Sequence, residues 1–157
     1  MPAPDRERLI EELGHQARAS TLWTVLLHNA IASRSGINVT DMQCINLLQL
    51  RGPMTPGQLA DAMFLTTGGA ITAVIDRLEK AGMVRRRRDE DDRRRVIVEA
   101  AEGGATAALS ARFAPVAEQY GKLLESYSDE HLAVILDYLK RTNEGSPEMI
   151  EQVRQLG

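Results

Sequence analysis

The sequence predicts a mainly α-helical protein with one small β-ribbon. Its 157 residues are 43% hydrophobic but only 4% aromatic, so the core must consist mostly of aliphatic side chains. That composition suits packed helices better than stacked sheets. Apolar residues recur at steps of three and four along most of the chain, and only the segment after Gly82 changes to alternating and β-branched residues. We therefore expect helices to form most of the fold.

The first predicted element is one long amphipathic helix from Arg6 to about Ser33. This stretch contains no proline, and one stripe of residues follows alternating steps of four and three. The stripe consists of Leu9, Leu13, Gln16, Ser20, Trp23, Leu27 and Ala30. Glycine and polar residues at positions 35–38 then end the helical pattern.

Two shorter helices follow, and each is predicted to begin with a capping box. In a capping box, the N-cap side chain and the side chain three residues later satisfy each other's backbone N–H. The sequence pairs Thr40 with Gln43 in the first helix and Thr55 with Gln58 in the second. Pro56 stands at the first position of the second helix, where its missing N–H has no cost.

A fourth helix is introduced by the hydroxyl residues Thr66 and Thr67 and ends at Gly82. Its apolar face consists of Ile71, Val74, Ile75 and Leu78. Its outward face consists of Thr67, Gly68, Gly69, Thr72, Ala73 and Arg77. Together with the preceding short helix, it makes a helix-turn-helix pattern.

The segments 83–87 and 96–98 are predicted to pair as a two-stranded ribbon around a charged tip at 89–95. The chain has a net charge of −3, but residues 66–95 contain nine basic and six acidic side chains. The charge of this region is therefore +3, and such an asymmetry is typical of a basic binding face. The arginines of 85–88 alternate across a strand, so only some of them can face phosphates.

Helical spacing returns from Glu102 to Tyr127, with Pro115 as the expected bend. Ser128 is predicted to cap another helix that ends at residues 145–147, before a short final segment at 149–156. Apolar stripes at both ends of the chain would leave a large apolar surface on a monomer. Pairing across a two-fold axis would cover that surface, so we expect a homodimer.

These elements fit a reader of double-stranded DNA. A helix fits the major groove, and an arginine-rich loop can enter the narrower and strongly negative minor groove beside it. We therefore predict three segments: an N-terminal dimerisation helix (1–34), a winged helix-turn-helix DNA-binding domain (35–100) and C-terminal dimerisation helices (101–157).

The stretch from Ile71 to Ala100, ITAVIDRLEKAGMVRRRRDEDDRRRVIVEA, resembles the recognition helix and wing of the MarR family of bacterial transcriptional regulators. The order of the predicted helices is similar to that family from about residue 6 to residue 143. The resemblance implies a winged helix-turn-helix in an obligate homodimer that binds a pseudo-palindromic operator. It also implies a repressor whose DNA affinity falls when a small lipophilic or phenolic effector binds.

The resemblance extends to individual residues. Asp89, Asp92 and Arg94 stand where the family has its wing pattern Asp-x-x-Asp-x-Arg, which implies a minor-groove role for Arg94 and an arginine-orienting role for Asp92. Ala73 occupies a position where relatives often have arginine. Arg77 is interpreted as a phosphate contact. The expected DNA contacts are Thr66, Thr67, Gly68, Gly69, Thr72, Ala73, Arg77, Arg87, Arg93, Arg94 and Arg95.

The effector expected from the resemblance would occupy a crevice bordered by Trp23, His28, Met42 and Met63. Two alternatives stay open at this point. One is a redox-sensing regulator that acts through Cys44, although a buried inert thiol fits its apolar helix better. The other is a helical dimer whose basic wing binds an acidic protein partner.

The sequence favours a binding protein over an enzyme. Its three histidines are far apart, and it has no metal-binding motif, no phosphate loop after a strand and no nucleophile elbow, so we expect no metal and no cofactor. A single cysteine and the absence of a signal segment favour the cytoplasm. No apolar stretch approaches the roughly 20 residues that a membrane-spanning helix needs.

Overall fold

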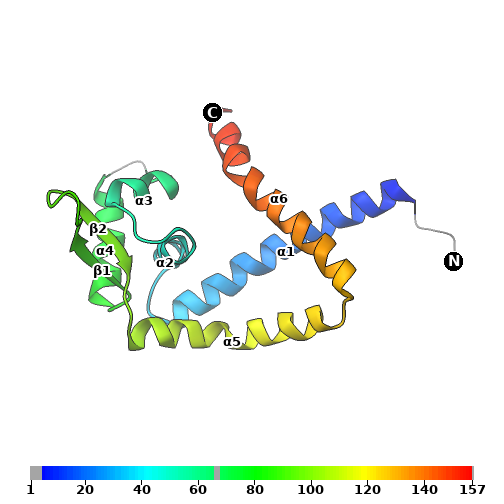
Figure 1. The fold of residues 1–157 in the computed structure, drawn as a ribbon, viewed down its shortest axis with the longest axis horizontal. Helices are drawn as coiled ribbons and strands as arrows, with labels where there is room; N and C mark the ends of the chain where they lie inside the picture. The colour runs from blue at the N-terminus through cyan, green and yellow to red at the C-terminus, as the bar shows by residue number, and fades with distance from the viewer. Residues whose placement is uncertain (1–4, 66–67, 157) are drawn as a thin grey trace. The chain divides into compact units, whose positions relative to one another are not determined.

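The computed structural model describes residues 5–65 and 68–156. The chain divides after Phe113 into two compact units. The elements follow the order α1 (Arg6–Arg34), α2 (Val39–Arg51), α3 (Pro56–Ala62), α4 (Gly68–Lys80), β1 (Val84–Arg88), β2 (Val96–Ala100), α5 (Gly104–Glu125) and α6 (Asp129–Arg154) (Figure 1). The expected mainly α-helical fold with a small β-wing is confirmed.

Helix α1 is one uninterrupted helix, as its periodicity predicts. Asp5 caps it, because the Asp5 carboxylate accepts a hydrogen bond from the Glu7 N–H at 3.2 Å. Burial in this helix is confined to Ile31 and Ala32, near its C-terminal end. Large apolar side chains earlier in the helix are exposed, including Trp23.

The predicted start of α2 is wrong by two residues. The capping box joins Asn38 and Asp41, rather than Thr40 and Gln43. The Asn38 side chain accepts from the Asp41 N–H at 2.8 Å, and the Asp41 carboxylate accepts from the Asn38 N–H at 3.1 Å. Asn38 has the extended backbone that an N-cap needs, so the helix begins before Thr40 can serve as the cap. Gly52, with a φ of 78°, ends this helix.

Helices α3 and α4 agree with the predicted pattern. Thr55 and Gln58 form both hydrogen bonds of the second capping box, and Pro56 stands at the start of the helix. The predicted apolar face of α4 is buried, and it consists of Ile71, Val74, Ile75 and Leu78. Thr66 and Thr67, the expected first residues of this element, lie outside the described residues.

The predicted ribbon is confirmed as an antiparallel hairpin of β1 and β2, and it lies beside α4 (Figure 1). Its register places Arg86 opposite Val98. Met54 forms an isolated antiparallel bridge with Val98, because their backbone groups exchange two hydrogen bonds of 3.0 and 2.8 Å. We call residues 84–100 the wing and residues 89–95 the wing tip.

One hydrophobic core joins α2, α3, α4 and the wing within the first unit. Its largest fully buried apolar side chains are Met42, Ile45, Leu59, Ile75, Leu78 and Val98. The apolar area removed from water by such side chains is the main source of stability for this unit. The core therefore fixes the inner faces of α4 and the wing and leaves their polar faces outside.

In the second unit, the predicted break at 145–147 is wrong, because α6 continues as one helix through Pro147 to Arg154. Ser128 caps it as predicted, accepting from the His131 N–H. A proline fits helical backbone angles and removes one hydrogen bond, and on an exposed helix water can replace that bond. No described residue of α6 is buried, and its exposed apolar side chains include Leu136 and Leu139.

No helix in the described part of the chain is both long enough and apolar enough to cross a membrane.

Candidate nucleic-acid interface

The outward face of α4 consists of small and polar side chains. Gly69, Thr72, Ala73 and Arg77 are all exposed on it, as the sequence predicts. Gly68 is the first residue of the helix, and its first turn carries no acidic residue. Small side chains leave room for a close approach of another surface, and a first turn without acidic residues does not repel negative charge. The face is therefore suited to an anionic polymer.

Arg77 is anchored to the protein, which the sequence pattern did not show. Its Nε and Nη2 atoms donate to the Asp41 carboxylate at 3.2 and 2.7 Å. Asp41 is buried, whereas the Arg77 side chain is 47% exposed. The hydrogen bond to Asp41 raises the pKa of Arg77 above its ordinary value. This guanidinium therefore has an internal partner in addition to the phosphate contact that the sequence analysis expects of it.

A second arginine joins the wing to α4. The Arg86 guanidinium donates to the carboxylates of both Asp76 and Glu79. Its backbone N–H also donates to Glu79, at 3.2 Å. Asp76 and Glu79 stand three residues apart on α4, so both reach the same side of the helix. The sequence analysis did not predict this contact, although the three-residue spacing of Asp76 and Glu79 was a signal that could have indicated it.

Arg85 and Arg87 share one carboxylate on the neighbouring strand. Their Nε atoms donate to Glu99 at 2.6 and 2.8 Å. The hydrogen bond from Arg87 is the main cause of the lowered pKa of Glu99. The register explains the arrangement, because Glu99 lies directly opposite Arg85 and the two arginines point to the same side of β1. Arg87 is one of the expected DNA contacts, and in this structure it also forms an ion pair with Glu99.

The wing tip is held by aspartates through the backbone. Asp89 Oδ1 accepts from the N–H groups of Asp91 and Asp92 at 2.9 and 3.3 Å, and these bonds lower the pKa of Asp89. Asp92 Oδ1 in turn accepts from the Arg94 N–H at 3.0 Å. Asp92 was expected to orient an arginine side chain. Its described bond to Arg94 is to the main chain, so it orders the loop that carries the arginine.

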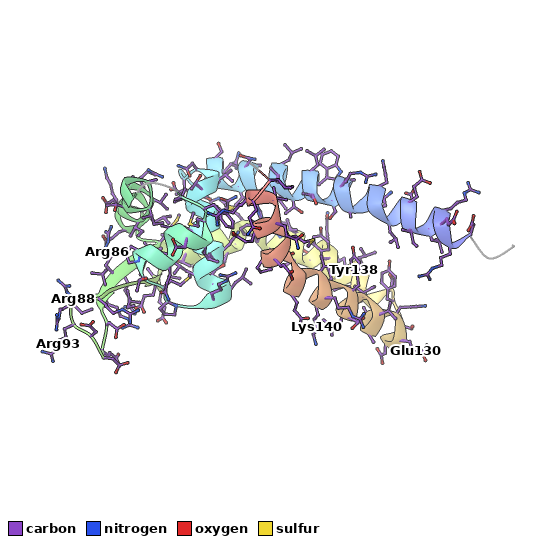
Figure 2. The ribbon with its side chains drawn as sticks, turned by 90° about the horizontal axis from the view of Figure 1, so that it is seen from above. Arg86, Arg88, Arg93, Glu130, Tyr138 and Lys140 are labelled. Atoms are coloured by element: carbon purple, nitrogen blue, oxygen red, sulfur yellow. The ribbon has the colours of Figure 1, made fainter. Side chains whose placement is uncertain are left out.

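Four arginines of the wing form no close ion pair among the residues that the structure describes, although the charge of Arg95 contributes to the lowered pKa of Asp89. They are Arg88, Arg93, Arg94 and Arg95, and all four are exposed. Figure 2 shows Arg86, Arg88 and Arg93 in this order toward the tip of the hairpin. The internal ion pairs therefore lie at the base of the wing, whereas these four arginines lie at and near its tip, on either side of the acidic residues at 89–92 in the sequence.

The expected effector contacts have different environments. Met42 is 1% exposed and packs in the core, and its role beside an effector stays a prediction. Met63 is half-buried against the same core. His28 packs edge-on against the Phe113 ring, with the ring centres 5.8 Å apart. Trp23 is 67% exposed.

Cys44 is fully buried in α2. Burial raises the pKa of its thiol to about 11, and the neighbouring charge of Asp41 contributes to the rise. Because the thiolate is the reactive form, this environment favours an inert side chain. The geometry therefore speaks against the redox-sensing alternative.

Comparison with known proteins supports the resemblance seen in the sequence. A model of the MarR family matches residues 35–95, from the loop before α2 to the wing tip. The chain is 36% identical over 132 residues to YcgE, an uncharacterized HTH-type transcriptional regulator of Bacillus subtilis, and the match covers 84% of each chain.

Solved structures share the fold. A MarR family protein from Bacillus stearothermophilus aligns with a TM-score of 0.68 at 23% identity, over 91% of this chain and 99% of that one. FabT of Streptococcus pneumoniae in complex with DNA aligns with a TM-score of 0.60 at 21% identity, over 92% of this chain and 99% of that one. A mutant MarR of E. coli in complex with operator DNA aligns with a TM-score of 0.52 at 22% identity, over 88% of this chain and 98% of that one. The fold, the family model and the extensive match to a regulator agree, and the chain belongs to the MarR family of transcriptional regulators.

Proposed function

We propose that this protein is a homodimeric repressor that binds a pseudo-palindromic operator in double-stranded DNA. The exposed face of α4 enters the major groove, and the wing tip enters the adjacent minor groove. The observation that carries the proposal is the segregation of charge on the wing. Arginines at its base are in internal ion pairs, whereas Arg88 and residues 93–95 are exposed and form no close ion pair with another described residue.

The composition of α4 determines what kind of readout it can provide. Glycine, threonine and alanine on its outward face allow contacts through hydroxyls, backbone amides and methyl groups. Because position 73 is an alanine and not a long basic residue, this face supplies few charge-assisted contacts to bases. The wing arginines and the shape of the minor groove then supply a large share of the affinity. DNA complexes of the related FabT and MarR are consistent with this class of partner.

Dimerisation is proposed from the exposed apolar side chains of the long helices. In α1, Leu13 and Trp23 are 63% and 67% exposed, and in α6, Val134 and Val153 are 69% and 67% exposed. Single exposed apolar residues are ordinary, but rows of them on long helices are typical of association surfaces. We therefore assign 1–34 and 101–157 to dimerisation and 35–100 to DNA binding, in the cytoplasm where bacterial DNA lies.

The dimer has a direct test. Leu139→Glu places a charge on the apolar face of α6, and we expect it to shift the protein toward monomers in sedimentation velocity at micromolar concentration. Lys140→Glu on the neighbouring exposed position serves as the control and should leave the dimer intact. A dimer that tolerates both changes would remove α6 from the interface.

We also propose that a small lipophilic or phenolic effector lowers operator affinity by changing the relation between the two DNA-binding domains of the dimer. Support comes from the family resemblance and from the half-buried His28 and Met63 near the ends of α1 and α3. Titration of the operator complex with salicylate is a first check, with release of DNA as the expected result.

The central experiment is selection of bound duplexes from a random library, followed by titration of the winner and of a scrambled duplex at two salt concentrations. We expect an enriched inverted repeat that is bound about 10³-fold or more tightly than scrambled DNA, together with a steep salt dependence. Weak binding to every duplex without enrichment would contradict the proposal. It would favour the alternative in which the basic wing binds an acidic protein partner.

A further inference from the structure

Asp41 carries a charge in a place where charges are rare. Asp41 stands at the third position of α2 and is 1% exposed. Among the residues that the structure describes, no other charged side chain is buried. A carboxylate removed from water strongly destabilises a fold unless charged or hydrogen-bonding partners compensate. The partners of Asp41 therefore show what the charge is for.

Two of its three hydrogen bonds come from one side chain. Asp41 Oδ1 accepts from Arg77 Nη2 at 2.7 Å, and Oδ2 accepts from Arg77 Nε at 3.2 Å. The third bond is the capping contact, in which the Asn38 N–H donates to Oδ2 at 3.1 Å. Arg77 lies 36 residues further along the chain, on another helix. The carboxylate thus connects the first turn of α2 to the C-terminal half of α4.

Arg77 also belongs to the outward face of α4. Gly69, Ala73 and Arg77 follow each other at steps of four, so they form one exposed stripe along the helix. Nearly half of the Arg77 side chain remains accessible although two of its nitrogens are bound to Asp41. The residue therefore stands at the border between the core and the face proposed to meet DNA.

We propose that Asp41 is a positioning residue for DNA recognition. A guanidinium that binds a carboxylate through two nitrogens is fixed in direction as well as in distance. By holding Arg77 in this way, Asp41 sets the orientation of α4 on α2 and determines how well the protein distinguishes its operator from other DNA. The inference rests on the function proposed above, and it gives Arg77 a different role from the phosphate contact expected from the sequence.

Three variants separate positioning from a simple charge effect. Asp41→Asn keeps the shape of the side chain and an acceptor for the Asn38 N–H, but it loses the charge. Arg77→Lys keeps the positive charge, but a lysine cannot form the two-point contact through a planar fork. Asp41→Asn combined with Arg77→Lys tests whether the two residues act as one unit.

The experiment uses the full-length protein, the duplex enriched from the random library and a scrambled duplex, each titrated over a range of salt. We expect each single variant to lower the ratio of operator affinity to scrambled affinity by about tenfold, and the double variant to be no worse than either one. The salt dependence on scrambled DNA should stay unchanged. Asp137→Asn and Arg141→Lys alter a matched, exposed ion pair on α6 and should leave the ratio unchanged.

Several results would overturn the inference. If Arg77→Lys binds like the wild type, or if Arg77→Gln weakens binding to both duplexes equally and reduces the salt slope by about one, Arg77 is a phosphate ligand. Far-ultraviolet circular dichroism checks that each variant is folded. If Asp41→Asn has lost its helical signal, the affinity ratio of Arg77→Lys is the result that tests the inference. A wild-type protein that enriches no operator would instead contradict the proposed function, so the two failures are distinguishable.

Discussion

Arg86 of the wing and Glu79 of α4 are joined twice, because both the guanidinium and the backbone N–H of Arg86 donate to the Glu79 carboxylate. A side-chain contact alone would allow the strand to slide or rotate against the helix. The additional main-chain bond fixes the strand itself. The base of the wing and α4 are therefore held together as one piece, and the wing tip extends from this support.

Arg94 is the wing residue whose replacement should weaken operator binding most clearly. Its N–H is held by Asp92 at 3.0 Å, and its side chain is exposed. We expect Arg94→Ala to weaken specific binding by about 1–3 kcal/mol. Fluorescence anisotropy with the selected operator measures the loss, with sedimentation to confirm that the dimer is intact. Arg141→Ala is the control for loss of a charge, and unchanged affinity would exclude Arg94 from the interface.

Glu99 should make the free energy of unfolding depend on pH in the acidic range. Its pKa is lowered in the folded protein by its hydrogen bond from Arg87. Its contribution is therefore present above its ordinary pKa of 4.5 and is lost as the pH falls through the lower folded value.

Glu99→Gln cannot ionise, so we expect it to melt below the wild type at pH 7. The gap should narrow as the pH falls below the ordinary Glu99 pKa of 4.5 and through the lower folded value. Thermal unfolding followed by circular dichroism at several pH values tests this. A gap that is independent of pH would mean that the Glu99 charge contributes nothing and that the side chain acts through packing.

Cys44 should be unreactive in the folded protein. With a thiol pKa of about 11, on the order of one molecule in 10⁴ carries the thiolate at pH 7, and the side chain is fully buried. We expect a thiol reagent to label Cys44 quickly only in guanidinium chloride, and peroxide to leave operator binding unchanged. Cys44→Ala, which should cost about 1 kcal/mol of stability, provides the control. Rapid release of DNA by peroxide in the wild type alone would restore the redox-sensing alternative.

Pro147 should limit the stability of α6. It lies inside the helix, where proline removes a hydrogen bond and crowds the preceding turn. We expect Pro147→Ala to raise the free energy of unfolding by about 1–3 kcal/mol in urea denaturation. Pro56→Ala at the first position of α3 is the matched control and should have little effect. No gain at position 147 would mean that the helix ends earlier in solution, as the sequence pattern predicts.

Local signals predicted most of the fold. The long α1, the capping box of α3, the buried face of α4 and the hairpin each depend on spacings of a few residues, which a sequence displays directly. The error at α2 was also local, since Asn38 and Thr40 are both good caps and the backbone at Asn38 decides between them. Pro147 misled the prediction because proline disfavours a helix without forbidding it.

The candidate site was less predictable, because its essential contacts join distant segments. The sequence predicts that arginines 85–88 alternate across a strand, but it does not show which carboxylates each of them meets. Arg86 meets two carboxylates of α4, and Arg85 and Arg87 meet Glu99. The link between Asp41 and Arg77 spans 36 residues and required tertiary structure to be seen. Composition shows the total charge, and only the fold shows which charges are neutralised.

The carboxylate of Asp41 takes part in two structures at once, the cap of α2 and the ion pair with α4. Opening either one removes a partner that the other needs. The amide of Asn38 and the amides in the middle of α4 should then exchange with deuterium as a single cooperative unit, with similar protection. We therefore expect the start of α2 and the middle of α4 to open together.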